Sequence, residues 1–272
     1  MKSYLSKRAL FAALAVLAAN TANADVFTAW NFDNLSAAVN NTPLASTGVG
    51  SASALGMTNN YTYTGGKTVV TGSVNTDDVL ADATTGDTTQ MWRVRGQTPG
   101  NGWNNAAPQY SQGAQFTTST VGYSNIDLKF DWFSTAQGIR DMQVQYTTDG
   151  STWSNVGSLL VNTTPNTAFT TQEINFGVLG ITSVENNANF GVRLVSAYDP
   201  TLSAAAGQNE YAAATLSSGQ PVQYNNNSGN WRFDNVIFSG TSISAVPEPE
   251  TYGMMLSGIG LMGFVARRRK SA

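Results

Sequence analysis

Carboxylates are the main chemically active side chains that this sequence offers to a functional site. The chain contains no histidine and no cysteine, which excludes a Ser-His-Asp triad, a Cys-His pair and any imidazole or thiolate metal site. A hard cation such as Ca²⁺ needs only carboxylate, carbonyl and water oxygens, and a glycosidase needs only two carboxyl groups. The chemistry open to this chain is therefore calcium binding or hydrolysis by a carboxylate pair.

A five-residue pattern, Trp-x-Phe-Asp-Asn, occurs at residues 30–34 and again at 231–235. If the first and last strands of the body pair with each other, the two copies bring Asp33 and Asp234 together as oxygen ligands for Ca²⁺. The alternative is that the aromatic residues are matching core positions on neighbouring strands, and that Asp-Asn ends each strand. Both interpretations require the two ends of the body to meet in one sheet.

The other acidic residues form weaker patterns. Glutamate occurs only three times between residues 25 and 245, and Glu173 falls in an expected strand. Four aspartates gather in the loop at 75–89, but their spacing does not match a calcium-binding EF-hand loop. A solvated acidic loop explains that cluster better than a metal site. A secreted carbohydrate-active enzyme that uses a carboxylate pair is kept as the alternative to a protein without catalysis.

Sugar binding is a further kind of chemistry that the composition allows. Binding sites for small polar ligands combine aromatic rings with a few hydrogen-bonding groups, and the chain is rich in asparagine. Trp103 lies within Gly-Asn-Gly-Trp-Asn-Asn at residues 100–105 and has the most loop-like surroundings of the aromatic residues. We expect Trp103 to present its ring to a glycan. The alternative is that it caps one end of the core.

The body between residues 25 and 245 shows the period-2 alternation of half-buried strands. An example is the run from Ile126 to Trp132, in which apolar and charged residues alternate strictly. An Asp-Gly pair at 149–150 between two such runs predicts a hairpin. Further strands are expected near residues 26–32, 67–71, 90–95, 114–118, 142–146, 169–176, 190–194 and 230–238.

Many short strands without crossover helices predict an all-β fold, an antiparallel β-sandwich of the jelly-roll type. We expect this domain to occupy residues 25–245, flanked by an N-terminal signal helix and a short C-terminal apolar helix. Long polar loops are expected at 34–60, 75–89, 96–113 and 199–229.

Residues 1–24 have the pattern of a secretory signal peptide, with a basic start and an apolar run at 9–19. Ala22 and Ala24 supply the two small side chains that signal peptidase requires, so cleavage would leave Asp25 first in the mature chain. The alternative is an N-terminal membrane anchor, but the apolar run is too short to span a bilayer.

Residues 246–272 form a second terminal signal. Pro247, Glu248 and Pro249 precede an apolar segment at 251–266. At about 1.5 Å per residue this segment is shorter than the ~30 Å hydrocarbon core of a bilayer. The positive-inside rule predicts that the basic cluster after it stays in the cytoplasm. That cluster consists of Arg267, Arg268, Arg269 and Lys270.

This order of Pro-Glu-Pro, short apolar helix and basic cluster resembles the PEP-CTERM sorting tail; the alternative is a plain single-pass anchor. The resemblance implies processing by signal peptidase and then by an exosortase, a membrane transpeptidase-like cysteine protease. It also implies a Gram-negative bacterium that makes exopolysaccharide. The protein would be anchored transiently in the inner membrane through its tail, and would then reach the cell surface or the extracellular matrix.

The body resembles an uncharacterised bacterial sandwich module that often precedes such tails, through pieces such as residues 144–150 and 232–236. No catalytic residues come with that resemblance. Residues 25–246 carry 7 basic and 15 acidic side chains, so that 7 − 15 = −8. This charge repels a phosphate backbone and disfavours nucleic-acid binding through a basic patch, so we expect no nucleic acid as a partner. Ca²⁺ is the cofactor that the charge would suit. We therefore expect a structural, adhesive or glycan-associated protein of an exopolysaccharide layer.

Overall fold

The computed structural model shows an all-β body. The chain divides into two compact units, Met1–Ser242 and Ile243–Ala272, and in the second only Ile243 and the helical residues Ser257 and Gly258 are described. No helix among the described residues is long and apolar enough to cross a membrane. The expected signal helix and C-terminal apolar helix lie outside the described residues, which are 24–33, 42–56, 61–62, 68–69, 91–94, 103–202, 210–224, 229–243 and 257–258.

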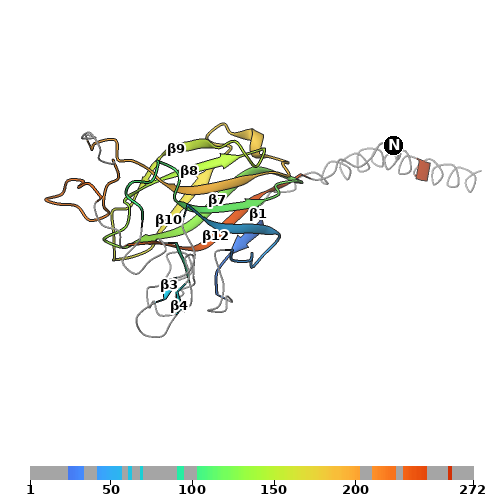
Figure 1. Cartoon of the computed structure of the whole chain (residues 1–272). Helices are drawn as coiled ribbons and strands as arrows, with labels where there is room; N and C mark the ends of the chain where they lie inside the picture. Colours follow the sequence, from blue (N-terminus) through green and yellow to red (C-terminus); the bar gives the residue numbers. More distant parts are fainter. Residues whose placement is uncertain are drawn as a thin grey trace, which may run out of the picture. The chain divides into compact units, whose positions relative to one another are not determined.

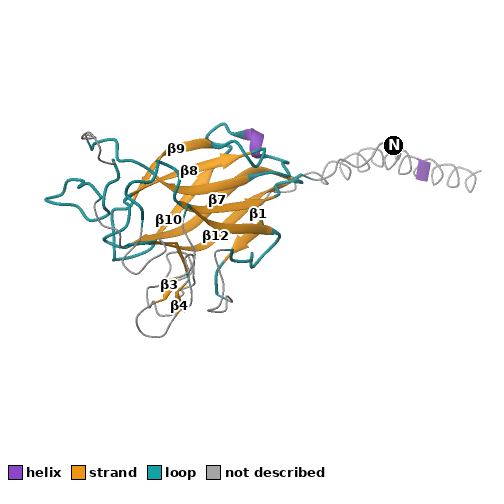
Figure 2. Cartoon of the chain, viewed as in Figure 1, coloured by secondary structure: helices purple, strands orange, loops and turns teal. Residues whose placement is uncertain are grey.

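Two five-stranded antiparallel sheets make up the body (Figures 1 and 2). Sheet A has the order β1-β12-β7-β10, and β5 pairs with the first residues of β12, before the stretch that pairs with β1. Its strands are β1 (Ala24–Trp30), β5 (Trp92–Val94), β7 (Tyr123–Ser134), β10 (Thr170–Asn175) and β12 (Trp231–Ser242). Sheet B has the order β2-β6-β11-β8-β9, from β2 (Gly50–Leu55), β6 (Gly113–Thr118), β8 (Asp141–Thr147), β9 (Ser154–Val161) and β11 (Gly191–Ser196).

The chain passes repeatedly from one sheet to the other. From β6 to β12 every connection crosses between the sheets except the β8–β9 hairpin. Repeated crossing between two sheets is typical of a jelly roll. A short hairpin of β3 (Tyr61–Thr62) and β4 (Thr68–Val69) and a 3₁₀ turn, η1 (Thr182–Val184), complete the described elements. The prediction of an all-β antiparallel sandwich is confirmed.

The core is aromatic and lies between the two sheets. In β7 the apolar members of the alternating run are buried, as the period-2 pattern predicts. Asp127 and Lys129 alternate with them and are partly exposed, whereas Asp131 is buried. Five of the six tryptophans are at most 1% exposed. Their rings meet largely edge to face, for example Trp132 on Trp231 at 5.4 Å between ring centroids. The sixth tryptophan, Trp153, is only partly buried.

Strand β2 falls within residues 34–60, which the sequence predicts to be a loop. Its sequence, Gly-Ser-Ala-Ser-Ala-Leu, lacks the β-branched and aromatic residues that mark a strand. The strand forms because it pairs along β6. Gly50 fits there because a Cβ atom would lie 2.6 Å from Trp30 Cη2. Strand β2 is therefore stabilised by its backbone pairing with β6 and by its close approach to Trp30, although its residues have low β-strand propensity.

The predicted loop at 199–229 also contains packed structure. Tyr211 and Tyr224 are buried, and Ala212 forms a β-bridge with Gln223. The Tyr211 hydroxyl donates to the Pro108 carbonyl at 2.9 Å. This segment therefore closes one end of the sandwich.

Candidate functional site

Of the two predicted calcium ligands, Asp33 lies in a segment after β1 and Asp234 lies within strand β12. Strand β1 pairs with β12 as far as Trp30 opposite Val236, which confirms that the first and last strands meet. Phe32 then takes a left-handed φ of 56°, and Asp33 follows outside the strand. There the Asp33 carboxylate accepts a hydrogen bond from Asn31 Nδ2 at 2.7 Å.

Asp234 is paired by register with Asp131 on β7, a neighbour that the sequence did not predict. Both side chains are buried. Asp131 accepts hydrogen bonds from Thr171 Oγ1 at 2.7 Å and from Asn235 Nδ2 at 3.2 Å. Within the part of the chain that the structure describes, no three acidic side chains gather as metal ligands. Calcium binding by Asp33 and Asp234 stays a prediction.

Trp103 is a core residue in the structure, so the expectation that it presents a ring to a glycan needs correction. It is 1% exposed, and its ring packs on Trp231 at 4.4 Å between centroids. The loop around it is fixed because the Gln112 side chain binds the backbone of Asn104 twice. Asn104 N donates to Gln112 Oε1 at 2.7 Å, and Gln112 Nε2 donates to the Asn104 carbonyl at 2.9 Å.

The predicted processing sites fall largely outside the described residues. This holds for Ala22, for the motif at 247–249 and for the basic cluster at 267–270. Ala24 and Asp25 open β1, where they pair with Thr241 and Gly240. The cleavage site between Ala24 and Asp25 stays a prediction.

The outer face of sheet B carries a row of polar side chains in register across all five strands. We call this set the polar row. Its members alternate along their strands with core residues such as Val192 and Leu194. With a spacing of about 4.8 Å between strands, the row extends for about 19 Å. From β2 to β9 the polar row consists of Ser53, Gln115, Arg193, Gln145 and Asn155.

The side chains of the polar row hold one another in place. Arg193 Nε donates to Gln115 Oε1 at 2.8 Å, and the Arg193 guanidinium carbon lies 3.9 Å from the centre of the Trp153 ring. Gln145 Nε2 donates to Asn155 Oδ1 at 2.9 Å. These contacts fix the rotamers before any ligand arrives, which reduces the entropy cost of binding.

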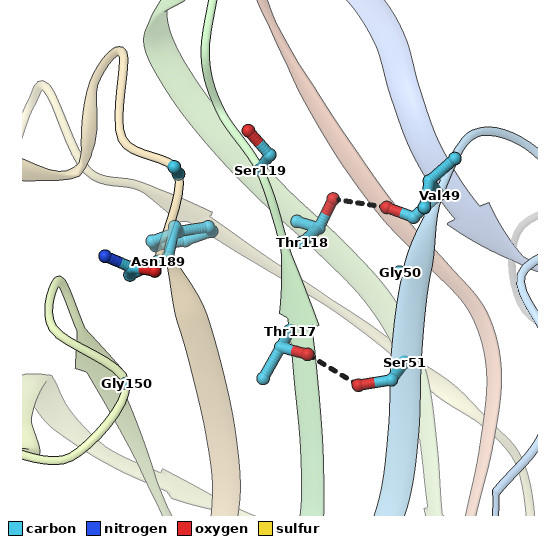
Figure 3. Close-up of a pocket in the computed structure, with 10 residues that line it drawn as sticks. Val49, Gly50, Ser51, Thr117, Thr118, Ser119, Gly150 and Asn189 are labelled. Carbon is cyan, nitrogen blue, oxygen red and sulfur yellow. Dashed lines mark hydrogen bonds between the residues drawn. The ribbon is translucent and has the colours of Figure 1, made fainter.

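A groove of about 380 Å³ lies beside the polar row on the same sheet (Figure 3). It is lined by β2, β6 and the segment that leads into β11. The hydroxyls of Ser51 and Thr117 point toward each other at 2.6 Å. Gly191 lies between Thr117 and Thr147 in register, and a Cβ there would lie 3.2 Å from both threonine methyl groups. Because Gly191 has no side chain, the outer surface of the sheet stays open between the two threonines.

The β8–β9 turn positions Trp153 next to the polar row. Asp149 Oδ1 accepts hydrogen bonds from Ser151 N at 2.8 Å, from Thr152 N at 2.7 Å and from Thr147 Oγ1 at 2.9 Å. These bonds favour the carboxylate and hold the pKa of Asp149 well below its usual range. Gly150 takes the left-handed φ of 76° that the turn needs. The hairpin predicted from Asp-Gly is confirmed.

The face therefore combines hydrogen-bond donors, hydrogen-bond acceptors and one partly exposed aromatic ring on a rigid sheet. Partial burial lowers the pKa of the Arg193 guanidinium. Sequence reasoning missed these residues because they come from strands distant in the chain. The available signal was the outward-facing half of the runs at 142–146 and 190–194, together with Trp153 just after a hairpin turn.

Comparisons with known proteins identify the C-terminal tail. Residues 245–270 match the PEP-CTERM protein-sorting motif. No curated protein sequence matches the chain. Among solved structures, the Clostridium thermocellum endo-1,4-beta-D-xylanase 10B CBM22-1-GH10 modules, complexed with xylohexaose, match 64% of this chain and 25% of that chain, at 10% identity and a TM-score of 0.34. The enzymatically active domain of bacteriophage CBA120 tailspike protein 4 matches 61% and 17%, at 10% identity and 0.28.

The fold and its outer face define an all-β sandwich with a preorganised polar surface. The chain spans no more than about a quarter of the solved chains that it matches. It carries a PEP-CTERM protein-sorting motif, and it is an exported protein that is sorted through the cell envelope by an exosortase.

Proposed function

We propose that the protein is a non-enzymatic surface or matrix component that binds a glycan chain along the outer face of sheet B. The observation that carries this proposal is the polar row, in which five side chains from five strands stand in register beside Trp153. The setting is the exopolysaccharide layer of a Gram-negative bacterium, reached after transient anchoring in the inner membrane.

The chemistry of the face suits a polyhydroxylated ligand. Each sugar hydroxyl both donates and accepts hydrogen bonds, and accessible amide side chains such as Gln115 and Asn155 offer both functions. The sheet holds these groups on a rigid frame, where binding requires little reorganisation. An extended face about 19 Å long suits a polymer better than a single small molecule.

Two features of sheet B support binding without hydrolysis. Glycoside hydrolysis needs two carboxyl groups that flank the scissile bond. Among the strands of sheet B, the one acidic residue is Asp141, which is 1% exposed. The polar row itself has no carboxyl group. The alternative, a carbohydrate-active enzyme, would require a site elsewhere on the molecule.

Replacing Trp153 with alanine should weaken polysaccharide binding by at least about tenfold, because an interface tryptophan is commonly a dominant contact. The purified chain would be titrated with bacterial exopolysaccharide, and reducing ends would be assayed in the same samples. The control is Leu179→Ala, which removes an exposed apolar side chain outside sheet B. Unchanged binding by the Trp153 variant would move the site elsewhere, and release of reducing ends would favour the enzyme.

Replacing Pro247, Glu248 and Pro249 together with alanine should block exosortase processing, because the matched sorting motif includes these residues. Uncleaved precursor should accumulate in the inner membrane fraction. The measurement is the mass and location of the protein in fractionated cells, with Ser242→Ala as the control upstream of the motif. A triple variant that reached the surface with the wild-type mass would contradict the sorting role of Pro-Glu-Pro.

A further inference from the structure

Arg193 is a positive charge at the centre of the polar row, and no acidic side chain among the described residues forms an ion pair with it. Ion pairs in the described residues join Lys129 to Glu173, and Arg140 to Asp141 and Asp199. Arg193 makes none of these contacts. Among the described residues its partners are the neutral amide of Gln115 and the ring of Trp153. These contacts fix the position of the cation, and within the described part of the chain no carboxylate pairs with it.

Placing the Arg193 charge in a partly buried position costs free energy, because the guanidinium loses part of its hydration. Partial burial disfavours the charged form of Arg193 and lowers its pKa. Its hydrogen bond to Gln115 uses Nε, while the two terminal nitrogens, which carry four of the five donors of a guanidinium, make no hydrogen bond with the described residues. These terminal groups form the planar fork that matches a carboxylate.

We propose that the ligand of this face is an acidic polysaccharide, and that Arg193 receives one carboxylate of each bound chain. The inference rests on the proposed glycan-binding function and names the substrate class. Trp153 holds the guanidinium plane on one side and Gln115 orients it through Nε. Asn155, an exposed neutral member of the polar row that Gln145 orients from beneath, contacts a hydroxyl of a neighbouring sugar unit.

The charge distribution of the sandwich permits an acidic chain to approach. Most acidic residues of the described strands belong to sheet A: Asp25, Asp127, Asp131, Glu173 and Asp234. The two sheets of a sandwich are about 10 Å apart, and the Debye length at physiological ionic strength is about 8 Å. Asp149, in the β8–β9 turn, is the acidic residue closest in sequence to Trp153, and its Oδ1 already accepts three hydrogen bonds.

The test compares polygalacturonate with the same polymer after its carboxyl groups have been reduced to alcohols. The full chain should bind the acidic polymer at least about tenfold more tightly, because hydrogen bonds to charged groups are worth more than neutral ones. Arg193→Gln should bind the two polymers equally. Lys129→Gln removes the same charge from sheet A and should keep the wild-type preference. Arg193→Lys keeps the charge but loses the fork, and should retain only part of the preference.

The outcomes separate this inference from the function on which it rests. If the full chain binds both polymers equally and Trp153→Ala weakens both, the face binds neutral glycans and the acidic preference is overturned. Binding of neither polymer, nor of any exopolysaccharide, would overturn the proposed function as well. A preference that Lys129→Gln removes as fully as Arg193→Gln would show a general charge effect and would also overturn the assignment to Arg193. Melting curves would confirm that each variant is folded.

Discussion

Replacing Trp231 with alanine should lower the free energy of unfolding by about 3–5 kcal/mol, the usual cost of removing a fully buried aromatic side chain. Trp231 is fully buried, and its ring meets those of Trp103 at 4.4 Å and Trp132 at 5.4 Å between centroids. Its indole Nε1 also donates to the Ile139 carbonyl at 2.7 Å. The substitution would leave a cavity between packed rings and a buried carbonyl without this donor.

Urea unfolding followed by circular dichroism measures this loss. The matched control is Trp153→Ala, which removes the same side chain from the outer face of sheet B and should cost less than about 1 kcal/mol. Since the domain has no disulfide, its stability depends on such packing. Equal losses for the two variants would contradict the placement of Trp231 at the centre of the core.

Much of the fold is encoded in short stretches of sequence and could therefore be predicted. The alternation from Ile126 to Trp132 predicts both the strand and its buried face, and Asp-Gly at 149–150 predicts the hairpin. The repeated Trp-x-Phe-Asp-Asn pattern predicts that the first and last strands meet, and β1 does pair with β12. Period-2 patterning and turn chemistry act over a few residues, so a single sequence reveals them.

The candidate site could not be predicted in the same way, because it depends on register between distant strands. Ser53, Gln115 and Arg193 are far apart in the sequence and become neighbours only when β2, β6 and β11 pair. For Trp103 the sequence predicted an exposed site residue, whereas the structure buries it in the core. Its neighbours are polar and rich in glycine, but the Gln112 clamp on Asn104 folds that loop inward. Local composition does not reveal such a tertiary contact.

Raising the pH from 5 to 8 should lower the melting temperature of the protein, and Asp141 should account for most of the change. Burial raises the pKa of Asp141 from 3.8 to about 7; Arg140 opposes this shift, and Asp199 adds to it by its charge and by accepting a hydrogen bond. The folded state therefore binds a proton that the unfolded state has already released. This contribution to stability is complete below pH 3.8 and is lost as the pH rises to about 7.

The expected loss between pH 5 and 7 is about 2 kcal/mol at 1.36 kcal/mol per unit, because half of the Asp141 carboxyls of the folded protein still hold their proton at pH 7. For a domain of this size it corresponds to roughly 4–8 °C in melting temperature. The chain has no histidine, so the side chain that most often titrates in this range is absent. Asp141→Asn places a neutral group at the same position and should remove the pH dependence, whereas Asp25→Asn, at an exposed position in β1, should retain it. A wild-type melting temperature that rises between pH 5 and 8 would show that the Arg140 charge outweighs burial and that Asp141 is ionised in the folded protein.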